Sequence, residues 1–113
     1  GELKYALSCF REALKIDTYY DEAWSDLGRI IIKENICDKA IPYLEHAYQV
    51  TGNIAGINYL LAACYFQTSN PEKAFRYLSL ALDSGRDCYC DYSDLFSSET
   101  KRINKLLKSH GLI

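Results

Sequence analysis

The chain has 113 residues, enough for one domain with a hydrophobic core, and 49% of them are hydrophobic, which argues against a disordered protein. Its formal net charge is −2, and acidic and basic residues are intermixed, so the basic stripe that binds nucleic acid is missing. The apolar runs are too short and interrupted for a membrane span. We therefore expect neither a nucleic-acid partner nor a membrane.

Apolar residues recur at three- and four-residue steps along most of the chain, the pattern of amphipathic helices. The predicted helices cover residues 3–16, 21–33, 37–50, 54–67, 71–84, 92–96 and 98–109. Asn35 suits a left-handed turn position, and Asn70 can cap a helix that has Pro71 in its first turn. Ser97-Ser98 is the predicted break in the last helical stretch. No strand pattern occurs in the sequence, so the predicted fold class is all-α.

Small and apolar residues repeat at a spacing of 34 residues. The repeating positions are Ala6, Ala40 and Ala74; Ala13, Ala47 and Ala81; Leu27, Leu61 and Leu95; and Phe10, Leu44 and Leu78. A fixed period of this length indicates a stack of similar two-helix units. Alanines two turns apart lie on one face of a helix, where they let a neighbouring helix approach closely.

Two consecutive units carry the same motif. The first is Trp24-x-x-Leu27-Gly28-x-x-Ile31 followed by Ala40-x-x-x-Leu44-x-x-Ala47, and the second is Asn58-x-x-Leu61-Ala62-x-x-Tyr65 followed by Ala74-x-x-x-Leu78-x-x-Ala81. This motif is similar to that of the tetratricopeptide repeat (TPR) family. The late proline of the family is absent, since Thr18, Gly52 and Arg86 stand in its place.

The resemblance implies antiparallel helix pairs stacked as a right-handed TPR solenoid, with about two and a half to three repeats plus a C-terminal capping helix. The single domain 1–113 would consist of the second helix of a truncated repeat (3–20), two repeats (21–53 and 54–86) and the capping helices (87–113). The sequence contains no methionine and begins within a repeat, so we expect it to be a fragment of a longer chain.

In this family the first helix of each unit lines a concave surface that binds a peptide or protein partner. The corresponding positions are Ser25, Arg29, Ile32 and Lys33 in one unit, and Tyr59, Ala63, Phe66 and Gln67 in the next. An aromatic floor and positive charge suit a peptide with an apolar anchor and an acidic group. The alternative is a solvated face with scattered aromatic residues.

The lysine–asparagine clamp that one TPR subtype uses to hold chaperone tails is missing. Its positions hold Ser25, Arg29, Leu60, Cys90 and Asp94. The sequence therefore gives no reason to expect a chaperone tail as the partner.

A structural role is the second hypothesis for this chain. The N-terminal helix lacks a covering partner, which leaves Leu3, Leu7 and Phe10 as candidates for self-association as a homodimer. Alternatively, the repeats act as a spacer in a larger protein. The C-terminal stretch, with Ile103, Leu106 and Leu107 among basic residues, is expected to cap the stack with its apolar side inward.

Five cysteines, without the spacing of a disulfide framework, favour a reducing compartment and a cytoplasmic location. Cys88 and Cys90 are the one pair that suggests a metal or redox site, but a second pair is missing because Cys37 stands alone and His46 and His110 are distant in sequence. The sequence contains neither a glycine-rich phosphate-binding loop nor a pair of carboxylates spaced for catalysis. We expect no cofactor and no enzymatic activity.

Overall fold

The computed structural model describes residues 4, 5, 8, 21–51, 54–84 and 89–111, and all regular structure in these residues is helical. The elements are α2 (Asp21–Lys33), α3 (Cys37–Thr51), α4 (Ala55–Gln67), α5 (Pro71–Asp83), α6 (Tyr89–Tyr92), the 3-10 helix η1 (Ser93–Glu99) and α7 (Thr100–Ser109). The all-α prediction is confirmed, and the predicted bounds of α2 to α5 agree with the structure to within one residue. None of the described helices is both long and apolar enough to cross a membrane.

The turns that follow α2 and α4 have the same backbone geometry. Asn35 and Ser69, which are 34 residues apart, both have positive φ, at 55° and 62°. After each of them a backbone N–H reaches back five residues, from Ile36 to the Ile31 carbonyl at 3.1 Å and from Asn70 to the Tyr65 carbonyl at 2.8 Å. These bonds satisfy carbonyls that the end of a helix leaves without partners. The sequence period is therefore repeated in the backbone.

The second of these turns leads directly into the capped start of α5. The Asn70 side chain accepts a hydrogen bond from the Lys73 N–H at 3.4 Å, and Pro71 is the first residue of the helix. A proline costs nothing there because the first N–H of a helix has no partner in any case. The predicted cap is confirmed.

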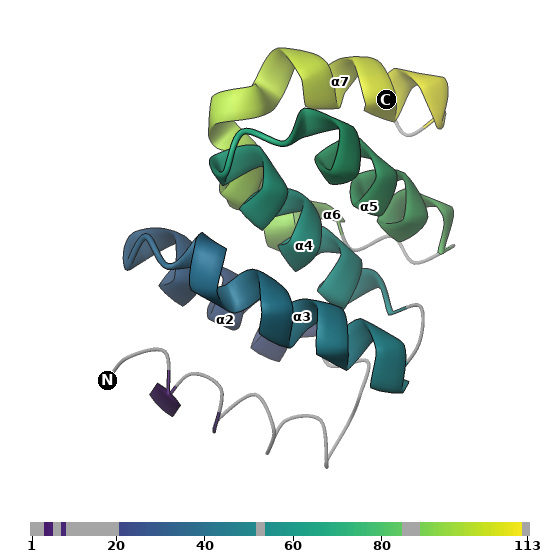
Figure 1. Cartoon of the computed structure of the whole chain (residues 1–113). Coiled ribbons are helices and arrows are strands. Elements are labelled where there is room, and N and C mark those ends of the chain that lie inside the picture. The colour runs from purple at the N-terminus through teal and green to yellow at the C-terminus, as the bar shows by residue number, and fades with distance from the viewer. Residues whose placement is uncertain (1–3, 6–7, 9–20, 52–53, 85–88, 112–113) are drawn as a thin grey trace.

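Helix α4 lies at the centre of the described structure, between the α2–α3 pair and α5 (Figure 1). Its residues from Ala55 to Tyr65 are all buried, as expected of a helix surrounded on every side. The described residues that follow the sequence period are buried too: Leu27, Leu61 and Leu95; Ala40 and Ala74; Leu44 and Leu78; and Ala47 and Ala81. The repeat thus specifies the core.

The C-terminal helices occupy two different places. Helix α6 contacts α2, and η1 contacts both α2 and α4, so together they cover one face of that pair. Helix α7 then runs alongside α5 at the far end of the structure (Figure 1), with Ile103 and Leu107 buried. The helical break lies at Glu99–Thr100 rather than at the predicted Ser97-Ser98, because Ser97 belongs to the same 3-10 helix as the buried Leu95 and Phe96.

Candidate binding surfaces

The face of α2 and α4 that the sequence assigns to a partner is occupied by the chain's own α6 and η1. Ser25, Tyr59 and Ala63 are only 3%, 0% and 2% exposed. The Tyr59 ring stacks on Tyr92 of α6 with 4.5 Å between the ring centroids and 20° between their planes. The expectation that these three residues form an open groove is therefore corrected, since their own chain covers them.

A glycine and an arginine on α2 show how η1 is held. A Cβ at Gly28 would lie only 2.7 Å from Leu95 Cδ1, so the leucine fits where residue 28 has no side chain. Beside it, Arg29 Nε donates to Asp94 Oδ2 at 2.8 Å, and a second guanidinium nitrogen reaches Oδ1 at 3.3 Å. This two-bond geometry suits the planar guanidinium group. The α2–α4 face thus holds η1 through one apolar contact, from Leu95 to Gly28, and one ion pair between Arg29 and Asp94.

The other predicted positions on this face remain at least partly accessible. Lys33 and Gln67 are exposed, and Ile32 and Phe66 are partly buried. The Phe66 ring lies between Phe75 of α5 and Phe96 of η1, with ring centroids 5.2 Å and 5.9 Å away and both pairs edge-to-face. Phe66 therefore connects the covered face with the space between α5 and α7.

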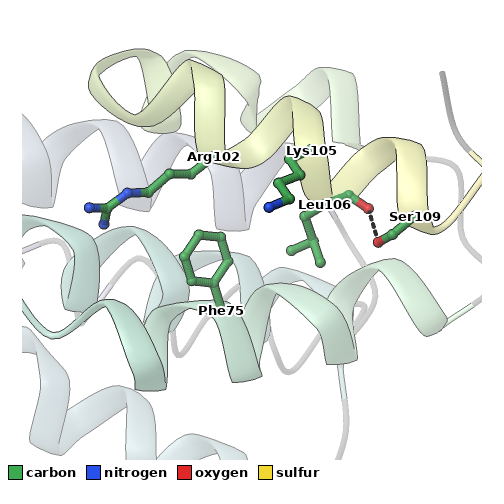
Figure 2. Close-up of a pocket in the computed structure, with 5 residues that line it drawn as sticks. All are labelled: Phe75, Arg102, Lys105, Leu106 and Ser109. Atoms are coloured by element: carbon green, nitrogen blue, oxygen red, sulfur yellow. Dashed lines mark hydrogen bonds between the residues drawn. The ribbon is translucent and has the colours of Figure 1, made fainter.

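A cleft opens between α5 and α7 (Figure 2). It has a volume of about 400 Å³ and mainly apolar walls, and we name it the α5–α7 cleft. Its lining residues are Phe75, Arg102, Lys105, Leu106 and Ser109. Figure 2 shows Phe75 pointing from α5 towards α7, with Arg102 and Lys105 on the α7 side.

The residues of α7 reach the cleft because they recur at three- and four-residue steps and so share one face of the helix. The neighbouring face carries Ile103 and Leu107, which are buried and fix the helix on the core. At the C-terminal end, His110 Nδ1 lies 3.0 Å from Asp83 Oδ1 and joins α7 to the end of α5. From the sequence, Leu106 was expected only to cap the stack. The signal in the sequence that could have identified its role is its spacing of four residues from Arg102 and three from Ser109, which places all three on one face of α7.

Positive charge gathers along α7. The helix contains Lys101, Arg102, Lys105 and Lys108 and no acidic residue. Glu99, which precedes it, approaches Arg102 with Oε2 at 3.7 Å from Nε, close to the outer limit for an ion pair. A second hollow, lined by Phe66, Ser69, Pro71, Glu99 and Arg102, shares Arg102 with the cleft and extends it towards the α4–α5 turn.

A tyrosine–glutamate cluster ties three helices together away from the cleft. Glu45 of α3 accepts hydrogen bonds from Tyr65 of α4 at 2.6 Å and from Tyr77 of α5 at 2.8 Å. The two tyrosine rings are stacked with centroids 5.7 Å apart. Burial, followed by the bond to Glu45, raises the pKa of Tyr77 to about 12 and also raises that of Tyr65. No sequence period links these residues, so the sequence did not predict the cluster.

Two cysteines that are distant in sequence meet in the core. Cys37 at the start of α3 and Cys64 of α4 are both buried, and the nearby Cys37 thiol, together with burial, raises the pKa of Cys64. The expectation that Cys37 stands alone is therefore corrected. Among the described residues, no three His, Cys, Asp or Glu side chains are placed to hold a metal ion.

Several predicted residues lie outside the described part of the chain. Leu3, Leu7 and Phe10, the candidates for self-association, are among them, and so are Cys88 and the side chain of Cys90. Comparison of the sequence and the structure with known protein families, curated proteins and solved structures finds no match.

Proposed function

We propose that this chain is a TPR-like protein-interaction module that binds a segment of a partner protein, and that it is not an enzyme. The helix pairs α2–α3 and α4–α5 would be the two repeats, 21–53 and 54–86, within the domain 1–113. Buried residues that recur every 34 positions, and two turns with matching backbone geometry, support this assignment. Repeat stacks build extended surfaces that commonly bind other proteins.

The α5–α7 cleft is the observation that carries the binding role. Helices α6 and η1 cover the α2–α4 face. The α5–α7 cleft, in contrast, is an open, mainly apolar hollow that a partner can reach without displacing any part of the chain. Its volume of about 400 Å³ falls within the range of roughly 300–1,000 Å³ that is typical of ligand sites. The partner would be a protein or peptide that places a side chain between Phe75 and Leu106.

Selection from a random peptide library tests this proposal. Peptides enriched on the purified protein should shift the NMR signals of α5 and α7, and Leu106→Glu should abolish their binding because it places a charge on the apolar wall. Tyr43→Ala is the control, since Tyr43 is an aromatic residue of α3 that is 49% exposed. Selected peptides whose binding survives Leu106→Glu would refute the proposed site.

Self-association remains the alternative role, as a homodimer through Leu3, Leu7 and Phe10 or as a spacer in a larger protein. Sedimentation at micromolar concentration tests the dimer, because a monomer at all concentrations would contradict it.

We also propose a cytoplasmic location, which the buried free thiols of Cys37 and Cys64 support, since disulfides are rare in that reducing compartment.

A further inference from the structure

We propose that the α5–α7 cleft selects an acidic peptide segment with one large apolar side chain. This inference rests on the proposed binding function and adds the chemistry of the partner. The apolar side chain would enter between Phe75 and Leu106, and the carboxylates would lie against Arg102 and Lys105.

The cleft has apolar surface available for one such side chain. Phe75 and Leu106 are partly buried, and both line the cleft from opposite helices (Figure 2). Transfer of a leucine or phenylalanine side chain from water to an apolar site favours binding by a factor of about 10 to 150. A peptide with serine in place of this residue would lose much of its affinity.

The charge around the cleft is positive. Arg102 and Lys105 belong to its lining, and Lys101 and Lys108 on the same helix are exposed. Three acidic residues are found on the elements around it: Glu99 makes a 3.7 Å contact with Arg102, Asp83 contacts His110 at the other end, and Glu72 precedes Phe75 by one turn of α5. A long contact of the Glu99 kind contributes little, so a peptide carboxylate can replace it. A basic peptide would be repelled by α7.

The chain already holds a segment of this chemistry elsewhere. On the α2–α4 face, Leu95 packs over Gly28, and the adjacent Asp94 bonds with Arg29. Both surfaces therefore combine an apolar contact with an arginine at its edge. The partner is expected to have its acidic residues directly beside the apolar one, as Asp94 is beside Leu95.

A peptide fits the cleft better than a membrane or a nucleic acid does. The apolar side chains Ile103 and Leu107 of α7 are turned into the core and only 1% and 5% exposed, so they offer nothing to a lipid bilayer. Duplex DNA binds through many phosphate contacts and keeps its bases stacked inside the helix, so it has no group for an apolar cleft between two helices. An acidic peptide uses both the apolar walls and the basic rim.

Fluorescence anisotropy with short synthetic peptides tests the inference. One peptide has leucine flanked by aspartate and glutamate; in the matched peptides the leucine becomes serine, the acids become their amides, or the acids become lysines. We expect binding of the first to weaken with added salt, because the charges on the rim are exposed and are screened over about 8 Å at physiological ionic strength. The serine and lysine peptides should bind at least about tenfold more weakly, and the amide peptide, which loses two exposed ion pairs without added repulsion, about 2- to 25-fold more weakly.

Two charge-reversed proteins identify the binding residues. Arg102→Glu/Lys105→Glu should weaken binding of the acidic peptide by about tenfold or more, since each exposed pair contributes a factor of about 1.5 to 5 and reversal adds repulsion. Lys33→Glu/Lys39→Glu changes the net charge equally but places the change on α2 and α3, away from α7, so we expect less than about a twofold effect. Circular dichroism verifies that both variants are folded.

The outcomes separate this inference from the proposed function. If library peptides that bind at the cleft are basic or neutral, the inference is wrong while the binding function stands. If no peptide binds at the cleft, both are wrong. Binding of phosphatidylserine vesicles or duplex DNA that Arg102→Glu/Lys105→Glu abolishes, without binding of the acidic peptide, would also overturn the inference and assign α7 to that ligand instead.

Discussion

Replacing Gly28 by alanine measures whether η1 packs on α2 as the structure has it. The new Cβ would lie 2.7 Å from Leu95 Cδ1 and 3.2 Å from Leu60 Cδ1. Non-bonded carbon atoms prefer a separation of about 3.5–4.0 Å, so Leu95 or η1 must move. In a protein that lacks the Leu95 side chain, the closest of these contacts disappears, and the same substitution should then stabilise α2.

The two terms that oppose each other have known sizes. Alanine in place of glycine inside a helix stabilises by about 0.8–1.0 kcal/mol, whereas overpacking a buried site costs about 1–3 kcal/mol. Gly28→Ala alone should therefore lower the free energy of unfolding by about 1 kcal/mol. Leu95 is 6% exposed, so Leu95→Ala should cost about 2–5 kcal/mol. Added to Leu95→Ala, Gly28→Ala should raise the free energy of unfolding by up to about 1 kcal/mol.

Urea unfolding followed by far-ultraviolet circular dichroism gives the free energies for the four proteins of this cycle. The expected signature is a change of sign in the effect of Gly28→Ala between the two backgrounds. Leu82→Ala, which removes a buried leucine of α5, serves as the control background, and there Gly28→Ala should act as it does in the parent protein. If Gly28→Ala stabilises all three backgrounds equally, Leu95 does not pack on Gly28.

Three further outcomes are expected. Burial and the bond to Glu45 raise the pKa of Tyr77 to about 12, from an ordinary value of about 10. The contribution of Tyr77 to the free energy of unfolding should therefore be complete below pH ~10 and disappear as the pH rises towards 12. NMR titration of the assigned Tyr77 ring signals should show a lower pKa for Tyr77 in Glu45→Gln, and an unchanged value would contradict the contact. Cys37 and Cys64 are only 3% and 1% exposed, so iodoacetamide should label them slowly in the folded protein and quickly in urea. Fast labelling of the folded protein, measured by mass spectrometry, would disprove their burial. Asn70→Ala should lower the free energy of unfolding by about 0.5–1 kcal/mol, while Asn70→Asp, which retains a cap, should cost clearly less; equal losses would exclude a capping role.

The candidate site shows where sequence reasoning stopped. Arg29 was expected to carry positive charge for a partner, and its guanidinium is instead bonded to Asp94 of the same chain. Tyr59 was expected on the groove floor, and it is buried under Tyr92. Both predictions came from the position of each residue within its own helix, and the bounds of α2 and α4 were predicted correctly. Neither could include the path of a segment that comes 30 residues or more later in the chain.

Local chemistry allowed the sequence by itself to determine the helices and the core. The spacing of Ala40, Leu44 and Ala47 defines one helix face, and repetition at Ala74, Leu78 and Ala81 indicates that the next unit packs alike. Asn35 and Asn70 determine turns because their conformations depend on the adjacent backbone alone.

Only the tertiary structure decided which surfaces stay open. Three features depend on which side chains of neighbouring helices meet, and the 34-residue period does not specify this. They are the proximity of Cys37 to Cys64, the bonds from two tyrosines to Glu45, and the cleft between Phe75 and Leu106. Whether a helix face is a binding site depends on what else the chain packs against it, and that is settled by the free energy of the whole fold rather than by any one period in the sequence.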